Sequence, residues 1–204
     1  MTRLFWFGRG SRLFDYDVQD NPRPPQEMIT MASKKTSIFT LTERLTMTAG
    51  TVDTDFFSTI DIGSYVDVGD RQALQIHSVN YVWQGATPGA SVATALGNGQ
   101  ATCQLTDLNR GAIVFANDRA LVSSGALIHD QDAYLTNVVD FFPDNFGKGS
   151  DDGRYVVNDQ LYLTARSTSL PTDLNLTVMI ECSIVSLTAK DFMAIAIQST
   201  AADN

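Results

Sequence analysis

The two histidines, His77 and His129, are the residues of this 204-residue chain best suited to acid–base or metal chemistry. A metal site on a β-sandwich needs several histidines and a carboxylate that converge from two strands. One histidine in a predicted strand and one in a distant predicted loop do not supply that set. We therefore predict neither a metal site nor a cofactor.

Oxygen ligands for calcium are the next chemistry to consider, because residues 129–132 read His-Asp-Gln-Asp. The segment lacks the ordered Asp/Asn spacing and the closing Glu of a calcium loop. We interpret it as a turn with solvated carboxylates. Asp151-Asp152-Gly153 is interpreted in the same way, as an exposed acidic turn.

Nucleophilic catalysis has no signature in the sequence. The Gly-x-Ser-x-Gly motif is absent, and neither histidine stands near a serine or cysteine in a triad pattern. Cys103 and Cys182 fall within predicted strands, where a small apolar residue would also fit. We expect two buried free thiols, with a disulfide as the alternative. No catalytic residue is predicted, and we expect that the chain is not an enzyme.

The first 14 residues carry a different chemistry, since they combine aromatic and basic side chains and contain no acid. Gly8 and Gly10 disfavour a helix, and residues 21–25 (Asn-Pro-Arg-Pro-Pro) favour a stiff, extended connection. We predict an arm that lies across neighbouring subunits, approaches a membrane surface or contacts phosphates. A tail or edge strand folded back on its own sandwich is the alternative. The predicted contact residues are Arg3, Phe5, Trp6, Phe7, Arg9 and Arg12.

The charge distribution separates this arm from the rest of the chain. The formal net charge is −9, and from Thr36 onward eight basic residues face nineteen acidic ones. We therefore expect the body of the protein to repel nucleic acid, whereas the arm need not.

The elements that position these residues follow a period of two. In residues 174–184 the even positions are apolar and most odd positions are polar, and residues 39–47 alternate in the same way apart from Glu43 at an inward position. Such alternation is typical of strands with one face in a core.

A change of phase interrupts the pattern within residues 72–84. The apolar residues fall at even positions before His77 and at odd positions after Ser78. One extra residue moves every later side chain to the other face of a strand. We therefore predict a β-bulge near His77 or Ser78.

Weaker patterns complete a set of eight predicted strands. Turn residues separate them, and no helical pattern lies between consecutive strands. The one predicted helix begins at Thr188, with Asp191 as a capping partner and Phe192 on its apolar side. The weaker strands cover residues 56–62, 101–105, 112–116, 134–142 and 161–166.

The predicted fold is an eight-stranded antiparallel β-sandwich, a jelly roll, with an extended N-terminal arm and a short C-terminal helix. We place the arm and its Pro-containing linker at residues 1–35 and a single jelly-roll domain at 36–204. No apolar run reaches the length of a membrane span. The run Leu4-Phe5-Trp6-Phe7 is too short for the core of a signal peptide, so we expect assembly inside a cell.

This combination resembles the single jelly-roll major capsid proteins of icosahedral viruses. The resemblance is carried by the arm at residues 1–14, the Pro-rich joint at 21–25 and the strands within 37–187. It implies a virion protein that self-assembles in the host cell interior into an icosahedral shell. Its partners would be copies of itself and other capsid proteins, and it would take no small-molecule substrate.

One departure from this family affects the role of the arm. Capsid arms that bind genomes carry far more Lys and Arg than the three arginines found here. This difference favours an arm that ties subunits together or approaches an inner membrane over one that packages the genome.

Two other functions fit the same strand rhythm. A jelly-roll carbohydrate-binding module, similar to lectins, could form a sugar site from the loops at residues 84–91 or 144–154. A structural component of a phage tail, fibre or baseplate is the second alternative. The basic aromatic arm and the missing signal sequence favour the shell protein.

Overall fold

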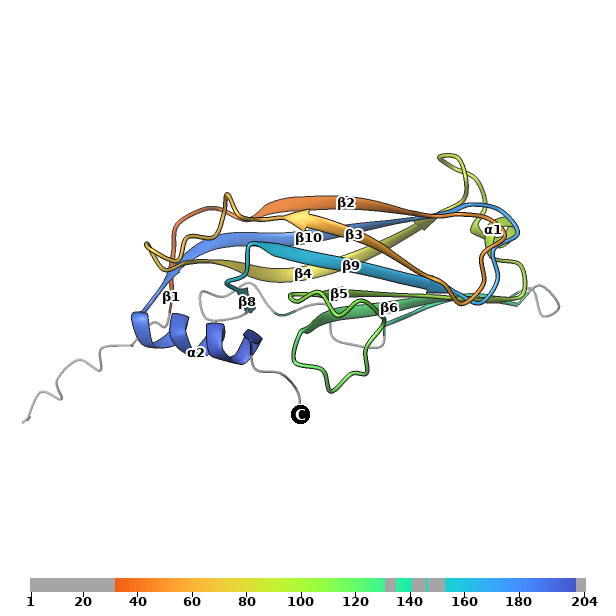
Figure 1. The fold of residues 1–204 in the computed structure, drawn as a ribbon. Helices are drawn as coiled ribbons and strands as arrows, with labels where there is room; N and C mark the ends of the chain where they lie inside the picture. The colour runs from red at the N-terminus through yellow and green to blue at the C-terminus, as the bar shows by residue number, and fades with distance from the viewer. Residues whose placement is uncertain (1–31, 131–134, 141–145, 147–152, 201–204) are drawn as a thin grey trace, which may run out of the picture.

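The computed structural model describes residues 32–130, 135–140, 146 and 153–200, which form two antiparallel sheets of five strands each (Figure 1). The first sheet contains β1 (Ala32–Lys34), β2 (Phe39–Met47), β4 (Gln72–Gln84), β8 (Arg154–Val156) and β10 (Leu174–Leu187). The second contains β3 (Asp55–Asp61), β5 (Gly99–Thr106), β6 (Leu121–Asp130), β7 (Leu135–Asp140) and β9 (Gln160–Ser167).

The strand order is that of a jelly roll. One sheet runs β2-β10-β4-β8, with β1 pairing the far end of β10, and the other runs β3-β9-β5-β6-β7. Apart from the consecutive strands β5, β6 and β7, the chain changes sheet after every strand from β2 to β10. Greek-key connections of this kind define the double-sheet jelly roll. The predicted all-β sandwich is therefore confirmed.

The two strands with the clearest alternation lie side by side. β10 pairs with β2 from Leu174 opposite Met47 to Cys182 opposite Phe39. The even side chains of β10 over this stretch are fully buried. The inward Glu43 keeps a polar partner, because Ser58 Oγ of β3 donates a hydrogen bond of 2.6 Å to its carboxylate.

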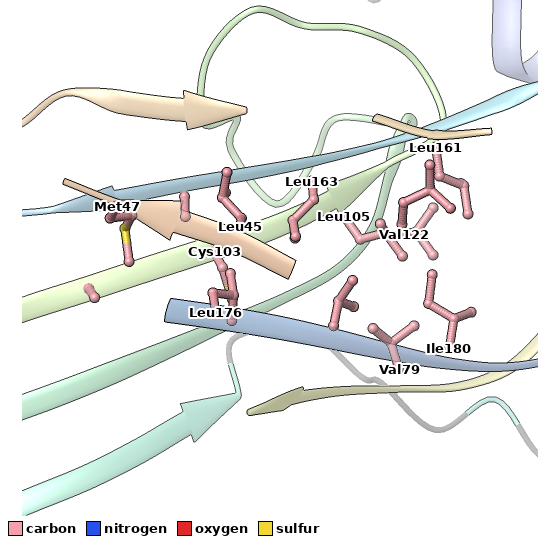
Figure 2. Packing of buried hydrophobic residues seen from close by; sticks show 14 of the residues in the cluster. Leu45, Met47, Val79, Cys103, Leu105, Val122, Leu161, Leu163, Leu176 and Ile180 are labelled. Carbon is pink, nitrogen blue, oxygen red and sulfur yellow. The ribbon is translucent and has the colours of Figure 1, made fainter. Parts of the chain in front are cut away.

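The core lies between the sheets and is filled from both of them (Figure 2). Burying one Leu, Ile, Val or Met side chain stabilises a fold by about 1.5–3 kcal/mol. The labelled side chains in Figure 2 are Leu45, Met47, Val79, Cys103, Leu105, Val122, Leu161, Leu163, Leu176 and Ile180.

The structure corrects the predicted strand list in two ways. The predicted strand at residues 112–116 is wrong: this segment is a loop, in which Phe115 is 86% exposed. The loop is held by Gln104, whose side chain donates to Val114 O and accepts from Val114 N, both at 2.7 Å. Strands β1, β6 and β8 were not predicted, so the structure has more strands than the eight that we predicted.

The predicted C-terminal helix is present as α2 (Ala189–Thr200). Thr188 caps it, since Asp191 N donates to Thr188 Oγ1 at 3.2 Å. Phe192 packs with Val185 and Leu187 in a small second core on the outer face of the first sheet. This placement explains why α2 lies beside β1 and β8 in Figure 1.

A second helix, α1 (Val92–Leu96), was not predicted, because its five residues are too few for a helical period to show. Ser91 caps its first turn by accepting from Ala93 N at 3.2 Å. No helix in the described residues is long and apolar enough to cross a membrane.

Candidate functional site

The predicted contact residues of the arm lie outside the described residues, and their role remains a prediction. The first described element is β1. β1 pairs antiparallel with the end of β10, with Ala32 opposite Leu187 and Lys34 opposite Val185. Ala32, the first described residue, therefore lies close to the start of α2. The predicted contact residues are Arg3, Phe5, Trp6, Phe7, Arg9 and Arg12.

The predicted bulge in β4 is confirmed at His77. Glu181 of β10 lies opposite Ser78, and the next residue, Cys182, lies opposite Ile76. His77 is thus the extra residue of β4, and its side chain is 1% exposed. Its carbonyl accepts a hydrogen bond of 2.8 Å from Phe146 N.

Folding brings His77 close to a serine that is remote in sequence. His77 Nε2 lies 2.9 Å from Ser183 Oγ, and Ser183 Oγ donates to Gln75 Oε1 at 3.2 Å. The Ser183 hydroxyl proton is directed at Gln75, so the hydroxyl oxygen is left to accept a hydrogen bond from His77 Nε2–H. In this arrangement His77 donates to Ser183 and does not act as a base that takes its proton. Gln75 and Ser183 are fully buried. The cluster is therefore a buried structural network and not a nucleophile open to a substrate.

The second histidine occupies a strand end and not a loop. His129 and Asp130 are the last two residues of β6, and His129 is 7% exposed. Residues 131 and 132 of the acidic segment lie outside the described residues. Within the described part of the chain, no group of three or more His, Cys, Asp or Glu side chains is placed to hold a metal ion.

A buried acid, Asp107, was missed by the sequence analysis. Arg154 Nη2 lies 3.3 Å from its Oδ2, and the same guanidinium nitrogen donates to Arg119 O at 2.6 Å. Asn158 Nδ2 donates to the Asp107 carbonyl at 2.6 Å. Burial raises the pKa of Asp107, and the positive charge of Arg154 opposes that rise. The cluster ties the loop after β5 to β8.

The two cysteines behave as predicted. Cys103 and Cys182 are free and buried. Burial raises the pKa of Cys182 to about 12, so its thiol stays protonated at neutral pH. Neither is placed to act as a nucleophile, because both face the core between the sheets.

A polar groove lies at one end of the first sheet and has a volume of about 260 Å³. Thr46 Oγ1 donates to Asn175 Oδ1 at 2.7 Å, and Asn175 Nδ2 donates to Gly85 O at 2.9 Å. The groove includes part of the loop at residues 84–91, one of the two predicted sugar loops. Its lining residues are Arg44, Thr46, Gln84, Gly85, Ala86, Pro88, Asp173 and Asn175.

An aromatic groove lies on the outer face of the second sheet and has a volume of about 360 Å³. Its floor is formed by neighbouring side chains of β3 and β9, where Thr59 pairs with Tyr162. Its wall is the loop after β5. Phe57 is 50% exposed at this groove. The lining residues are Phe57, Ser58, Thr59, Asn109, Gly111 and Tyr162.

Large apolar side chains are exposed on several sides of the sandwich. Phe57 lies on the second sheet, Met179 on the first, and Phe115 on the loop after β5. Met193 and Ile197 are four residues apart on α2, so they form one ridge on the helix surface. The described residues of this kind are Ile38, Val52, Phe57, Val68, Val82, Phe115, Met179, Met193 and Ile197.

No protein-family model and no curated protein matches this sequence. Among solved structures, the chain is similar to the VP1 pentamer of human polyomavirus 6, with a TM-score of 0.37 and 7% identity over 76% of this chain and 98% of that chain. It is also similar to a structure of desmodium yellow mottle tymovirus, with a TM-score of 0.32 and 11% identity over 76% of this chain and 90% of that chain. At TM-scores this low, neither likeness carries a conclusion about the function of this chain.

Proposed function

We propose that this chain is a structural, non-enzymatic capsid subunit that self-assembles into an icosahedral virus shell. The jelly roll suits this role, because two sheets packed over one core make a rigid unit whose loops and outer faces are free to form contacts. In this proposal copies of the chain and other capsid proteins are the partners. Assembly takes place in the host cell interior, and the product is the virion.

The observation that carries the proposal is the distribution of exposed apolar side chains. Monomeric proteins expose such side chains singly, and larger exposed apolar surfaces mark sites of association. Here Met193 and Ile197 form a ridge on α2, and Val82 and Met179 are diagonal neighbours on the outer face of the first sheet. A subunit enclosed by neighbours would cover surfaces of this kind on several sides at once.

The arm is the second part of the proposal. We assign to residues 1–14 contacts with neighbouring subunits or with the inner membrane or genome side of the shell. The arm carries Arg3, Arg9 and Arg12 on a chain whose net charge is −9, so it is the segment best suited to meet an acidic surface.

Electron microscopy and sedimentation of the purified full chain test this function. We expect closed particles, or rings that are fragments of them, with a sedimentation coefficient far above that of the 22.3 kDa monomer. A protein that remains monomeric at all concentrations, over a range of salt and pH, would contradict the proposal.

A carbohydrate-binding module is the second candidate, and the polar groove is the observation that favours it. Asn175, Asp173 and Gln84 present amide and carboxylate groups of the type that bind sugar hydroxyls. Strong and selective binding on a glycan array, lost in Asn175→Ala and Gln84→Ala, would favour this function. Binding to no glycan by a protein that forms particles would exclude it.

A further inference from the structure

β3 is an edge strand of the second sheet. β3 pairs with β9 along all seven of its residues, from Asp55 opposite Arg166 to Asp61 opposite Gln160. It is the end strand of its sheet, and within the described residues no strand pairs with its other side. Exposed strand edges of this kind are sites where further chain segments add on.

The surface beside this edge has a defined chemistry. The aromatic groove lies over the middle of β3, with Phe57 half-exposed in it. An exposed acid stands on each side: Asp53 precedes the strand and Asp61 ends it. Asp55 is already neutralised, because Arg166 Nε and Nη2 donate to its two oxygens at 2.7 and 2.6 Å. The surface therefore presents an acid, an aromatic pocket and a second acid in order along one strand.

We propose that this surface receives the N-terminal arm of a second copy of the chain. The arm has the complementary order, since Arg3 and Arg9 flank Phe5-Trp6-Phe7. In an extended arm Phe5 and Phe7 point to the same side as Arg3 and Arg9. These two aromatic residues fill the groove against Phe57 and Tyr162, and the arginines face the acids at the two ends of β3. This inference rests on the proposed function and assigns the contact surface that it requires.

The length of the arm is sufficient for this exchange. The 22 residues between Arg9 and Ala32 span about 70 Å when extended. A domain of this size has a radius of gyration of only about 15 Å. The arm therefore reaches beyond its own sandwich to the groove of a neighbour. Exchange between copies adds contact area to interfaces that are individually weak.

Disulfide trapping in the full chain tests the assignment. Phe7→Cys and Thr59→Cys are made in separate proteins, which are mixed and oxidised mildly. A docked arm should give roughly tenfold more mixed dimer than an undocked pair, because docking raises the effective concentration of the two thiols. The matched control replaces Thr59→Cys with Thr42→Cys, which is also an exposed threonine on an edge strand but lies in the first sheet.

The result distinguishes the possible occupants of the groove. Mixed dimers that form with Thr59→Cys and not with Thr42→Cys support the proposal. Equal yields with both variants overturn it. A double variant carries Phe7→Cys and Thr59→Cys in one chain. If it closes an intramolecular disulfide while mixed dimers are absent, the arm covers its own groove, and that result also overturns the proposal.

A second experiment separates this inference from the proposed function. Phe57→Ser removes the aromatic floor of the groove, and Met179→Ser removes an exposed apolar side chain from the opposite sheet. We expect Phe57→Ser to weaken self-association roughly tenfold and Met179→Ser to weaken it much less, because buried aromatic anchors dominate interfaces. If the original chain assembles and Phe57→Ser assembles equally well, the inference fails and the proposed function stands. If the original chain does not assemble, the proposed function fails, and the trapping experiment still decides whether the arm binds the groove.

Discussion

His77 Nε2 and Ser183 Oγ lie 2.9 Å apart at the position where β4 contains one residue more than β10. The bulge keeps the apolar side chains of β4 on the core face, although they fall at even positions before it and at odd positions after it. Before it Leu74 and Ile76 face the core, and after it Val79 does. The same bulge places His77 next to Ser183 and Gln75, all buried on the outer face of the first sheet.

Removing the Ser183 hydroxyl tests the importance of this network. We expect Ser183→Ala to lower the free energy of unfolding by about 1–3 kcal/mol, because His77 and Gln75 lose a buried hydrogen-bond partner. Urea unfolding followed by circular dichroism measures the change. Ser186→Ala, a half-buried serine of the same strand, serves as the control and should cost much less. Equal losses for the two variants would contradict the importance of the pair.

Cys182 is expected to be unreactive in the folded protein. Its pKa is raised to about 12 by burial, so at pH 8 only about one molecule in 10⁴ carries the thiolate. In a Cys103→Ala background, a chromogenic disulfide reagent should label Cys182 only after unfolding in urea. A thiol introduced by Thr42→Cys at an exposed position should react at once in the folded state. Rapid labelling of folded Cys182 would disprove the expectation.

Asp107 should make stability depend on pH. Its pKa is raised above the ordinary value of 3.8, so the folded state binds the proton more tightly than the unfolded state does. The contribution of Asp107 to the free energy of unfolding is therefore largest at low pH. It falls as the pH rises above about 3.8, until the carboxyl group is ionised in the folded state as well. Asp107→Asn removes this pH-dependent contribution to stability. The substitution also removes the charged partner of Arg154.

The measurement is the difference between the two proteins and not the stability of either one. The free energy of unfolding of Asp107→Asn minus that of the original chain should increase between about pH 4 and pH 7. Urea titrations at a series of pH values supply both curves. A difference that stays constant or decreases would mean that Asp107 is not the group responsible.

The strands that could be predicted from sequence are those with one face in the core and the other exposed to solvent or a polar surface. β10 and β2 alternate because their outward side chains face solvent or a polar surface. β6 was missed because residues 121–127 are buried on both faces, so no period of two appears. The wrong strand at 112–116 has an apolar composition, but its Phe115 is exposed. Composition alone does not distinguish a core strand from a loop with outward apolar side chains.

The polar clusters could not be predicted, because their members come from distant parts of the chain. His77 and Ser183 are 106 positions apart, and Asp107 and Arg154 are 47 apart. No local spacing connects such pairs. The pairing of β4 with β10 brings the first pair together, and the fold brings the loop after β5 in the second sheet to β8 in the first. The bulge itself was predictable, because a change of phase is a local signal.

The core residue Leu176 should be far more sensitive than its neighbour on the other face. Leu176 is fully buried between the sheets, whereas Met179 is 39% exposed on the same strand. Leu176→Ala should lower the free energy of unfolding by about 2–5 kcal/mol, because it leaves a cavity. Met179→Ala should change it by less than about 1 kcal/mol. Similar losses in urea unfolding would show that the even side chains of β10 do not form the core.

Deleting residues 1–25 should separate folding from assembly. The first described strand is β1, which begins at Ala32, so the truncated chain retains every strand that the structure describes. We expect a urea midpoint close to that of the full chain, together with a large loss of particles in sedimentation and electron microscopy. Normal assembly of the truncated chain would show that the arm is dispensable.

Two full-length variants then show which chemistry of the arm matters. Replacing Phe5, Trp6 and Phe7 with serine removes the apolar contacts, and replacing Arg3, Arg9 and Arg12 with alanine removes the charges. If the arm ties subunits together through the aromatic groove, the serine variant assembles poorly at every salt concentration, because apolar contacts are not screened. If the arm instead contacts lipid headgroups or phosphates, the alanine variant shows the greater defect, and raising the salt concentration reproduces that defect in the original chain.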